Sequence, residues 1–133
     1  MPDQEQQQAM QQYQQIQQQI EQVQEYVEQV EDNIEEARET INAVDSLEDL
    51  QEGSEVMAPV GSGVSVITEL KRSDEVVVNI GSDTMKRTDP EEAQEVLRGR
   101  KQNLEDTKEE LDETLEELRS QMQQIQTKLQ QQG

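Results

Sequence analysis

Apolar residues recur along the first third of the chain with steps that alternate between four and three. The run is Ala9, Tyr13, Ile16, Ile20, Val23, Val27, Val30, Ile34, Ala37, Ile41 and Val44. Gln, Glu and Asp fill most positions between them, and no Pro or Gly interrupts residues 3–52. A heptad pattern sustained for about five heptads is typical of a coiled coil. We therefore predict one long helix over residues 1–52, with Leu47 and Leu50 continuing the seam by steps of three.

A second apolar seam predicts another helix over residues 89–133. Its members are Leu97, Leu104, Leu111, Leu115, Leu118, Met122, Ile125 and Leu129. Lys101 and Lys108 occupy two seam positions within it. The start is marked by Asp89 as N-cap, Pro90 at the first helical position and Glu92 at the third, which is a capping-box pattern.

The period changes to that of β-strands between the two helices, over residues 53–88. Short β-branched runs at 55–60, 64–70, 75–80 and 84–88 are separated by polar turns, two of which contain glycine. This pattern predicts four strands in two hairpins. The fold class is therefore α+β, with two β-hairpins inserted in a long antiparallel two-helix coiled coil, in one domain.

The two seams match in length, so the helices should fold back on each other. If Val44 packs near Ala93, the numbers of facing residues sum to about 138, which places Lys108 opposite Val30. A seam lysine can lay its stem on an apolar neighbour and put its ammonium beside a carboxylate such as Glu28, Glu31 or Glu35. Two interpretations stay open: these lysines fix the register, or they only weaken the seam.

The strands point to an oligomer. One four-stranded sheet of some thirty residues has too small a core and open edges. The residues expected to seek burial against other chains are Val64, Val66, Val76, Val78 and Ile80.

Composition excludes most enzyme chemistry. The chain has no His and no Cys, hence no imidazole base, thiolate or ordinary zinc site. No serine stands in a nucleophile motif and no glycine-rich phosphate loop is present. Paired carboxylates such as Glu35 and Glu36 are typical of a solvated helix face. We predict a protein that is not an enzyme and needs no cofactor or metal.

The net charge of -20 limits the kinds of partner that the chain can bind. Nucleic acid and anionic membranes should be avoided. The acids run along the chain without gathering in one tail, which favours a surface adapted to molar salt over one that binds a basic partner. No segment is long and apolar enough for a membrane span, and the N-terminus lacks the features of a signal peptide. A cytoplasmic location is expected.

The order of elements resembles the alpha type of the prefoldin family. The most specific part runs from Val60-Gly61-Ser62-Gly63-Val64 through residues 76–82 to the helix start at Glu92-Ala93. The resemblance implies a hexamer of two alpha and four beta subunits, with a β-barrel platform from which coiled coils project. It also implies a chaperone that works without ATP, holds unfolded polypeptides at its tips and passes them to a group II chaperonin.

In this sequence the tips are the two chain ends. The residues that the resemblance places in contact with clients are Met10, Tyr13, Met122, Ile125 and Leu129. Most of them also belong to the seams, so both roles are open. The abundant glutamine at both ends is expected to be solubilising. Two alternatives remain: a structural coiled-coil scaffold or spacer with one defined partner, and an acidic decoy for a basic protein.

Overall fold

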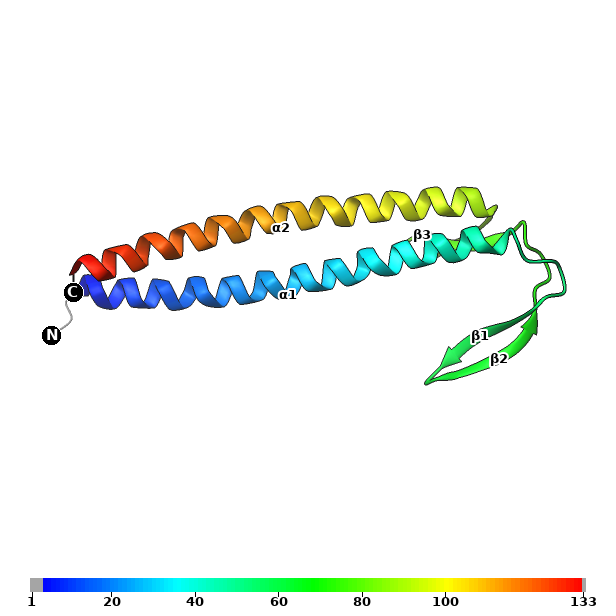
Figure 1. Ribbon diagram of the computed structural model, residues 1–133, viewed down its shortest axis with the longest axis horizontal. Helices are drawn as coiled ribbons and strands as arrows, with labels where there is room; N and C mark the ends of the chain where they lie inside the picture. The colour runs from blue at the N-terminus through cyan, green and yellow to red at the C-terminus, as the bar shows by residue number, and fades with distance from the viewer. Residues whose placement is uncertain (1–3, 133) are drawn as a thin grey trace. The chain divides into compact units, whose positions relative to one another are not determined.

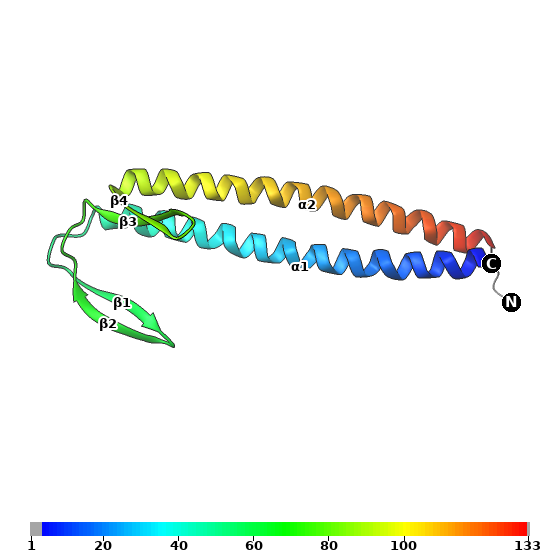
Figure 2. The same ribbon diagram turned by 180° about the vertical axis from the view of Figure 1, so that it is seen from behind.

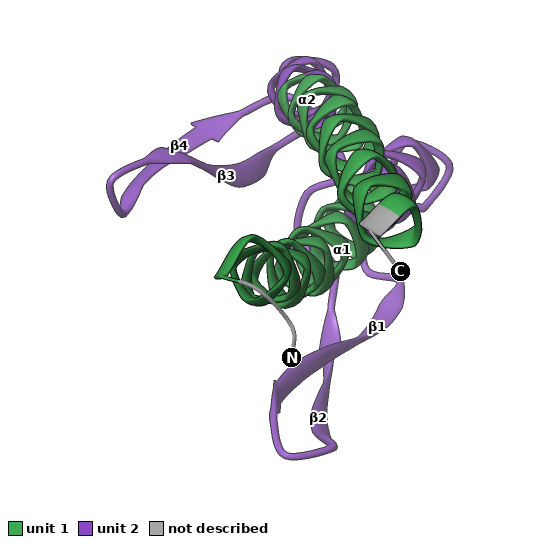
Figure 3. Cartoon of the chain, turned by 90° about the vertical axis from the view of Figure 1, so that its left-hand side faces the viewer, with its two compact units in different colours: residues 1–34, 103–133 green, residues 35–102 purple. Residues whose placement is uncertain are grey.

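The computed structural model describes residues 4–132. The elements follow in the order α1 (Gln4–Leu47), β1 (Glu55–Gly61), β2 (Val64–Glu69), β3 (Val76–Gly81), β4 (Thr84–Thr88) and α2 (Pro90–Gln132) (Figure 1). The predicted fold class of two long helices with two antiparallel hairpins between them is confirmed. Figure 3 shows the two compact units of the chain: unit 1 is Met1–Ile34 with Asn103–Gly133, and unit 2 is Glu35–Gln102.

Both predicted seams are observed. Between residues 9 and 44, every seam position is buried or half-buried and every other residue is exposed. The same holds for residues 97–129, including Lys101 and Lys108. In unit 1, Ile20, Leu115 and Leu118 form a buried cluster against which Ile16, Val23, Val27 and Met122 pack. Since 20 and 118 sum to 138, as do 23 and 115, this cluster agrees with the predicted register.

In unit 2 the first helix ends earlier than its pattern predicted. It stops at Leu47 instead of Glu52, and the amides of Glu48, Asp49 and Leu50 bond carbonyls three residues back. Such tightened bonds are common where an α-helix terminates. Leu50 therefore lies outside the seam and is 38% exposed.

The start of α2 follows the predicted cap. The Glu92 amide donates to Asp89 Oδ1 at 2.7 Å, and Pro90 occupies the first helical position. One turn further on, the buried Gln94 donates through Nε2 to the carbonyl of Ile41 at 3.1 Å. This bond joins the two helical segments of unit 2.

The hairpins form two separate two-stranded sheets, β1 with β2 and β3 with β4 (Figure 2). The prediction of four strands in two hairpins is confirmed, and neither hairpin pairs with a strand of the other. Each turn has two central residues at positive φ, Ser62 and Gly63 in the first and Ser82 and Asp83 in the second. This is the type I′ geometry that suits the twist of antiparallel strands. Gly61 and Gly81, at φ of 119° and 125°, stand where each register shifts.

Candidate functional site

The first candidate surface is the end of unit 1 where the two helix termini meet, hereafter the tip, residues 4–19 and 118–132 (Figure 1). The structure brings all five predicted client residues to this tip but distributes them over three open grooves. One groove is lined by Met10, Tyr13, Gln14, Gln17, Gln126 and Leu129. A second is lined by Gln12, Gln15, Ile16, Gln19, Gln121, Gln124 and Ile125.

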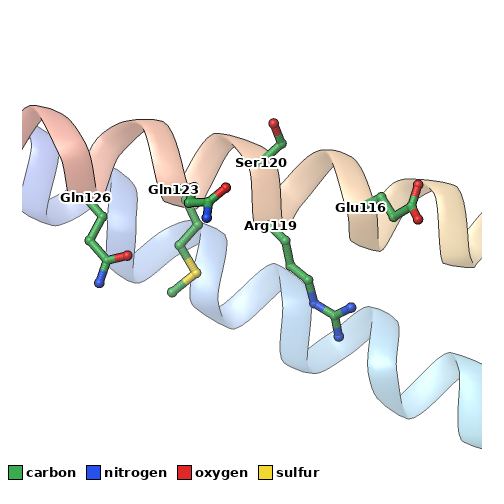
Figure 4. A pocket seen from close by; sticks show the side chains of 6 residues that line it. Glu116, Arg119, Ser120, Gln123 and Gln126 are labelled. Atoms are coloured by element: carbon green, nitrogen blue, oxygen red, sulfur yellow. The ribbon is translucent and has the colours of Figure 1, made fainter.

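Met122 contributes to the third groove, together with Glu116, Arg119, Ser120, Gln123 and Gln126 of α2. Figure 4 shows Arg119 and Gln126 pointing to the side of α2 on which α1 runs, and Ser120 to the opposite side. This groove differs from the other two because it contains charged side chains. Sequence reasoning missed the polar members of all three grooves, since glutamine carried no apolar signal.

The five predicted residues differ in exposure. Tyr13, Met122, Ile125 and Leu129 are half-buried in the seam, so each shows only part of its side chain to solvent. Met10 lies beside the seam and is 55% exposed. A flexible, polarizable side chain at this position can adapt to irregular apolar surfaces. Met10 is therefore the most accessible apolar contact among the five.

Charge is divided sharply within unit 1. The tip has Glu5 against Arg119 and Lys128, and with Asp3, which precedes it in the sequence, the side-chain charges at this end of the chain sum to zero. The adjoining part, residues 20–34 and 103–117, hereafter the shaft, has five acidic residues in its first segment and eight in its second. With Lys108, the shaft has a net charge of -12. The expectation that acids run along the whole chain was therefore wrong at the tip.

The second candidate surface consists of the strands predicted to oligomerise. Val64, Val66 and Ile80 are 57%, 47% and 50% exposed, and Val76 is half-buried. Val78 differs: at 8% exposed it is already covered by its own chain, contrary to the expectation that burial needs another subunit. Further exposed apolar residues of the hairpins, which sequence reasoning did not single out, are Met57, Val60, Ile67, Val77 and Met85.

A polar cluster connects β4 to the first turn of α2. The Glu92 carboxylate accepts from Lys86 Nζ at 2.8 Å and from the Thr88 hydroxyl. The hydrogen bond from Lys86 and, to a smaller extent, the one from Thr88 hold the pKa of Glu92 below its usual range. The hydrogen bond to Glu92 in turn raises the pKa of Lys86. Glu92 therefore stabilises the junction in its ionised form.

A second cluster closes the base of the β3–β4 hairpin. Glu75 accepts from Arg72 at 3.1 Å and pairs with Arg87 Nε at 2.8 Å. Because Arg87 is on β4 and Arg72 precedes β3, the carboxylate holds both ends of the hairpin.

Two further features are absent from residues 4–132. No group of three metal-ligating side chains was found among these described residues. Neither α1 nor α2, over the same range, is long and apolar enough to cross a membrane.

The family model for prefoldin subunits matches residues 4–133. The chain belongs to the prefoldin family. Prefoldins are chaperones that assemble with other prefoldin subunits. No curated protein matches the sequence.

The prefoldin fold is also found by structural comparison. The chain is similar to a chain in the cryo-EM structure of filamentous PFD from Methanocaldococcus jannaschii, with a TM-score of 0.80 and 24% sequence identity. The match covers 88% of this prefoldin chain and 97% of the other. The similarity therefore extends over the helices and the hairpins together.

Proposed function

We propose that this chain is an alpha-type subunit of an archaeal prefoldin that holds unfolded polypeptides at its tip without ATP. In this proposal it assembles with beta-type subunits, two alpha and four beta, and delivers its clients to a group II chaperonin. The assembly works in the cytoplasm of a salt-adapted cell. No catalytic residue, cofactor or metal takes part.

The tip carries the proposal. In a chaperone family, grooves that expose Met10, Tyr13, Ile125 and Leu129 beside uncharged amides offer contacts to apolar segments of a non-native chain. Such contacts are non-directional, so many sequences can use them. Glutamine amides can add hydrogen bonds to the exposed backbone of a client without requiring a charge on it.

The hairpins support the alpha assignment and the mode of assembly. Two hairpins between the helices are the feature by which the sequence resembles alpha-type subunits. Val64, Val66 and Ile80 expose apolar surface that pairing with strands of other subunits would bury. The similar Methanocaldococcus jannaschii chain comes from a filamentous assembly, so mass measurement of the assembled protein should distinguish a closed hexamer from a filament.

Suppression of aggregation tests the proposed function. The purified chain, with and without its cognate beta-type subunit, is mixed with several unrelated proteins as they unfold in molar KCl. A holdase suppresses the scattering of all of them without added ATP. A spacer that binds one defined partner leaves every scattering curve unchanged, and that result would exclude the proposal.

A further inference from the structure

The division of charge within unit 1 separates two surfaces of the same pair of helices. The nearly neutral tip adjoins the shaft, at -12, within the same two helical segments. At about 0.15 M salt, where charges act over roughly 8 Å, surface charge of this density repels a chain of like sign and attracts one of opposite sign before contact is made. In molar salt the same selection acts only over roughly 3 Å, at contact. The two surfaces must therefore differ in which unfolded chains they meet.

Two of the three grooves at the tip are suited to contact without charge. The groove formed by Met10, Tyr13, Gln126 and Leu129 and the groove formed by Ile16 and Ile125 are lined only by uncharged side chains. The basic residues of the tip, Arg119 and Lys128, lie within the same span of α2. A carboxylate on a bound chain would thus meet mostly amides at the tip, where Glu5 stands against two cations, but a dense row of carboxylates on the shaft.

We propose that the tip takes unfolded polypeptides that are themselves acidic, and that the shaft excludes such chains from the rest of unit 1. The inference rests on the proposed holdase function and names its substrate class. Apolar segments of an acidic client bind in the grooves, and their flanking carboxylates remain over neutral surface. A basic unfolded chain behaves differently, because the shaft attracts it away from the tip.

A pair of unfolded probe polypeptides tests this. Both carry the same apolar residues at the same spacing, one with aspartate and glutamate between them and the other with lysine. A photo-cross-linker replaces Gln14 at the tip or Gln29 on the shaft, both of which are exposed. In about 0.15 M KCl, where charges act over roughly 8 Å, the acidic probe should cross-link from position 14 and the basic probe from position 29.

Two triple variants separate local charge from total charge. The tip variant combines Gln14→Glu, Gln17→Glu and Gln126→Glu. Its matched control on the shaft combines Gln22→Glu, Gln24→Glu and Gln29→Glu, and all six glutamines are exposed on helices. Each variant adds three negative charges through nearly isosteric changes. Circular dichroism in the same buffer confirms that both retain their helices.

The tip variant should weaken binding of the acidic probe about tenfold in about 0.15 M KCl, and the loss should shrink in molar salt. The shaft variant should leave that affinity within about twofold, because its new charges join a surface that the probe already avoids. Equal losses in both variants, or none in either, would overturn the inference. If the unaltered protein binds neither probe at the tip, the proposed function itself fails. If it binds both there with equal affinity, the function stands and the charge selection does not.

Discussion

Lys108 places its ammonium nitrogen 3.4 Å from a carboxylate oxygen of Glu31, across the two helices of unit 1. The predicted position of a seam lysine beside an acidic residue of the facing helix is thereby confirmed. Both side chains remain partly exposed, at 38% and 51%, and such pairs contribute little to stability. The main effect of this contact is to give the Lys108 ammonium in the seam a partner of opposite charge, and it stabilises the helix pair little.

Replacing this lysine tests which role it has. Lys108→Leu should raise the free energy of unfolding by about 1 kcal/mol, because a leucine at this half-buried seam position gains more from burial than the partly exposed ion pair loses. Lys128→Leu, at an exposed site of the same helix, is the control for loss of one positive charge. Urea melts of the three proteins measure the difference. A less stable Lys108→Leu protein would show that the lysine is needed to fix the register.

The junction of β4 and α2 should depend on pH through Glu92. Its pKa is lowered by Lys86 and Thr88, so its stabilising contribution is complete above the ordinary glutamate pKa and is lost as pH falls through the lowered value. Lys86, whose pKa is raised, gives the opposite pH dependence. Its contribution to stability is complete below the ordinary lysine pKa and is lost as pH rises through the raised pKa.

Glu92→Gln should therefore be less stable than the unaltered protein at neutral pH and equally stable in acid below the lowered pKa. Glu91→Gln, the adjacent exposed residue of the same first turn, is the control. Thermal melts across the acid range give the comparison. A stability gap that persists unchanged into strong acid would contradict the ionised role of Glu92.

Assembly should respond differently to two valines in the hairpins. Val66→Lys changes a residue that is 47% exposed in the chain, so it should prevent association while the helices still form. Val78 is only 8% exposed in the chain, so Val78→Lys buries a charge and should destabilise the subunit as well as prevent association. Sedimentation with the beta-type subunit and circular dichroism distinguish the two effects. An unchanged assembly with Val66→Lys would remove β2 from the interface.

Salt should stabilise the chain because its negative charge is concentrated. The shaft, at -12, places carboxylates on both helices of unit 1, and molar salt reduces the range of their repulsion to roughly 3 Å. We expect greater helicity and a higher melting temperature in molar KCl than in about 50 mM KCl. A melting curve that does not move between these conditions would contradict adaptation to salt.

The helices and strands could be predicted from local pattern because their signals are periodic. The seam from Ala9 to Val44 and the glycine turns after Val60 and Ile80 specify elements without reference to distant residues. The end of α1 was missed because Leu50 fits the seam by spacing, whereas the last turn tightens after Leu47. Such termini depend on local hydrogen bonding more than on hydrophobic period.

Burial of single strand residues could not be read from the sequence. Val66 and Val78 have the same type of side chain and similar neighbours, yet one is exposed and the other is buried in the chain. The difference arises only when the chain is folded, so it is a tertiary property. At the tip the sequence identified the apolar residues, and the structure added the amide-lined grooves that surround them.

The central claim is that the tip holds clients, and removal of the tip tests it most directly. Deleting residues 1–14 together with 121–133 retains Ile20, Leu115 and Leu118, the buried cluster of unit 1, and both hairpins. The measurement is suppression of aggregation in molar salt by the intact and truncated chains, each assembled with the same beta-type subunit. We expect the truncated complex to assemble but to suppress aggregation less, and we expect the tips of the beta-type subunits to retain part of the activity. A truncated complex that assembles and holds clients as well as the intact one would contradict the account.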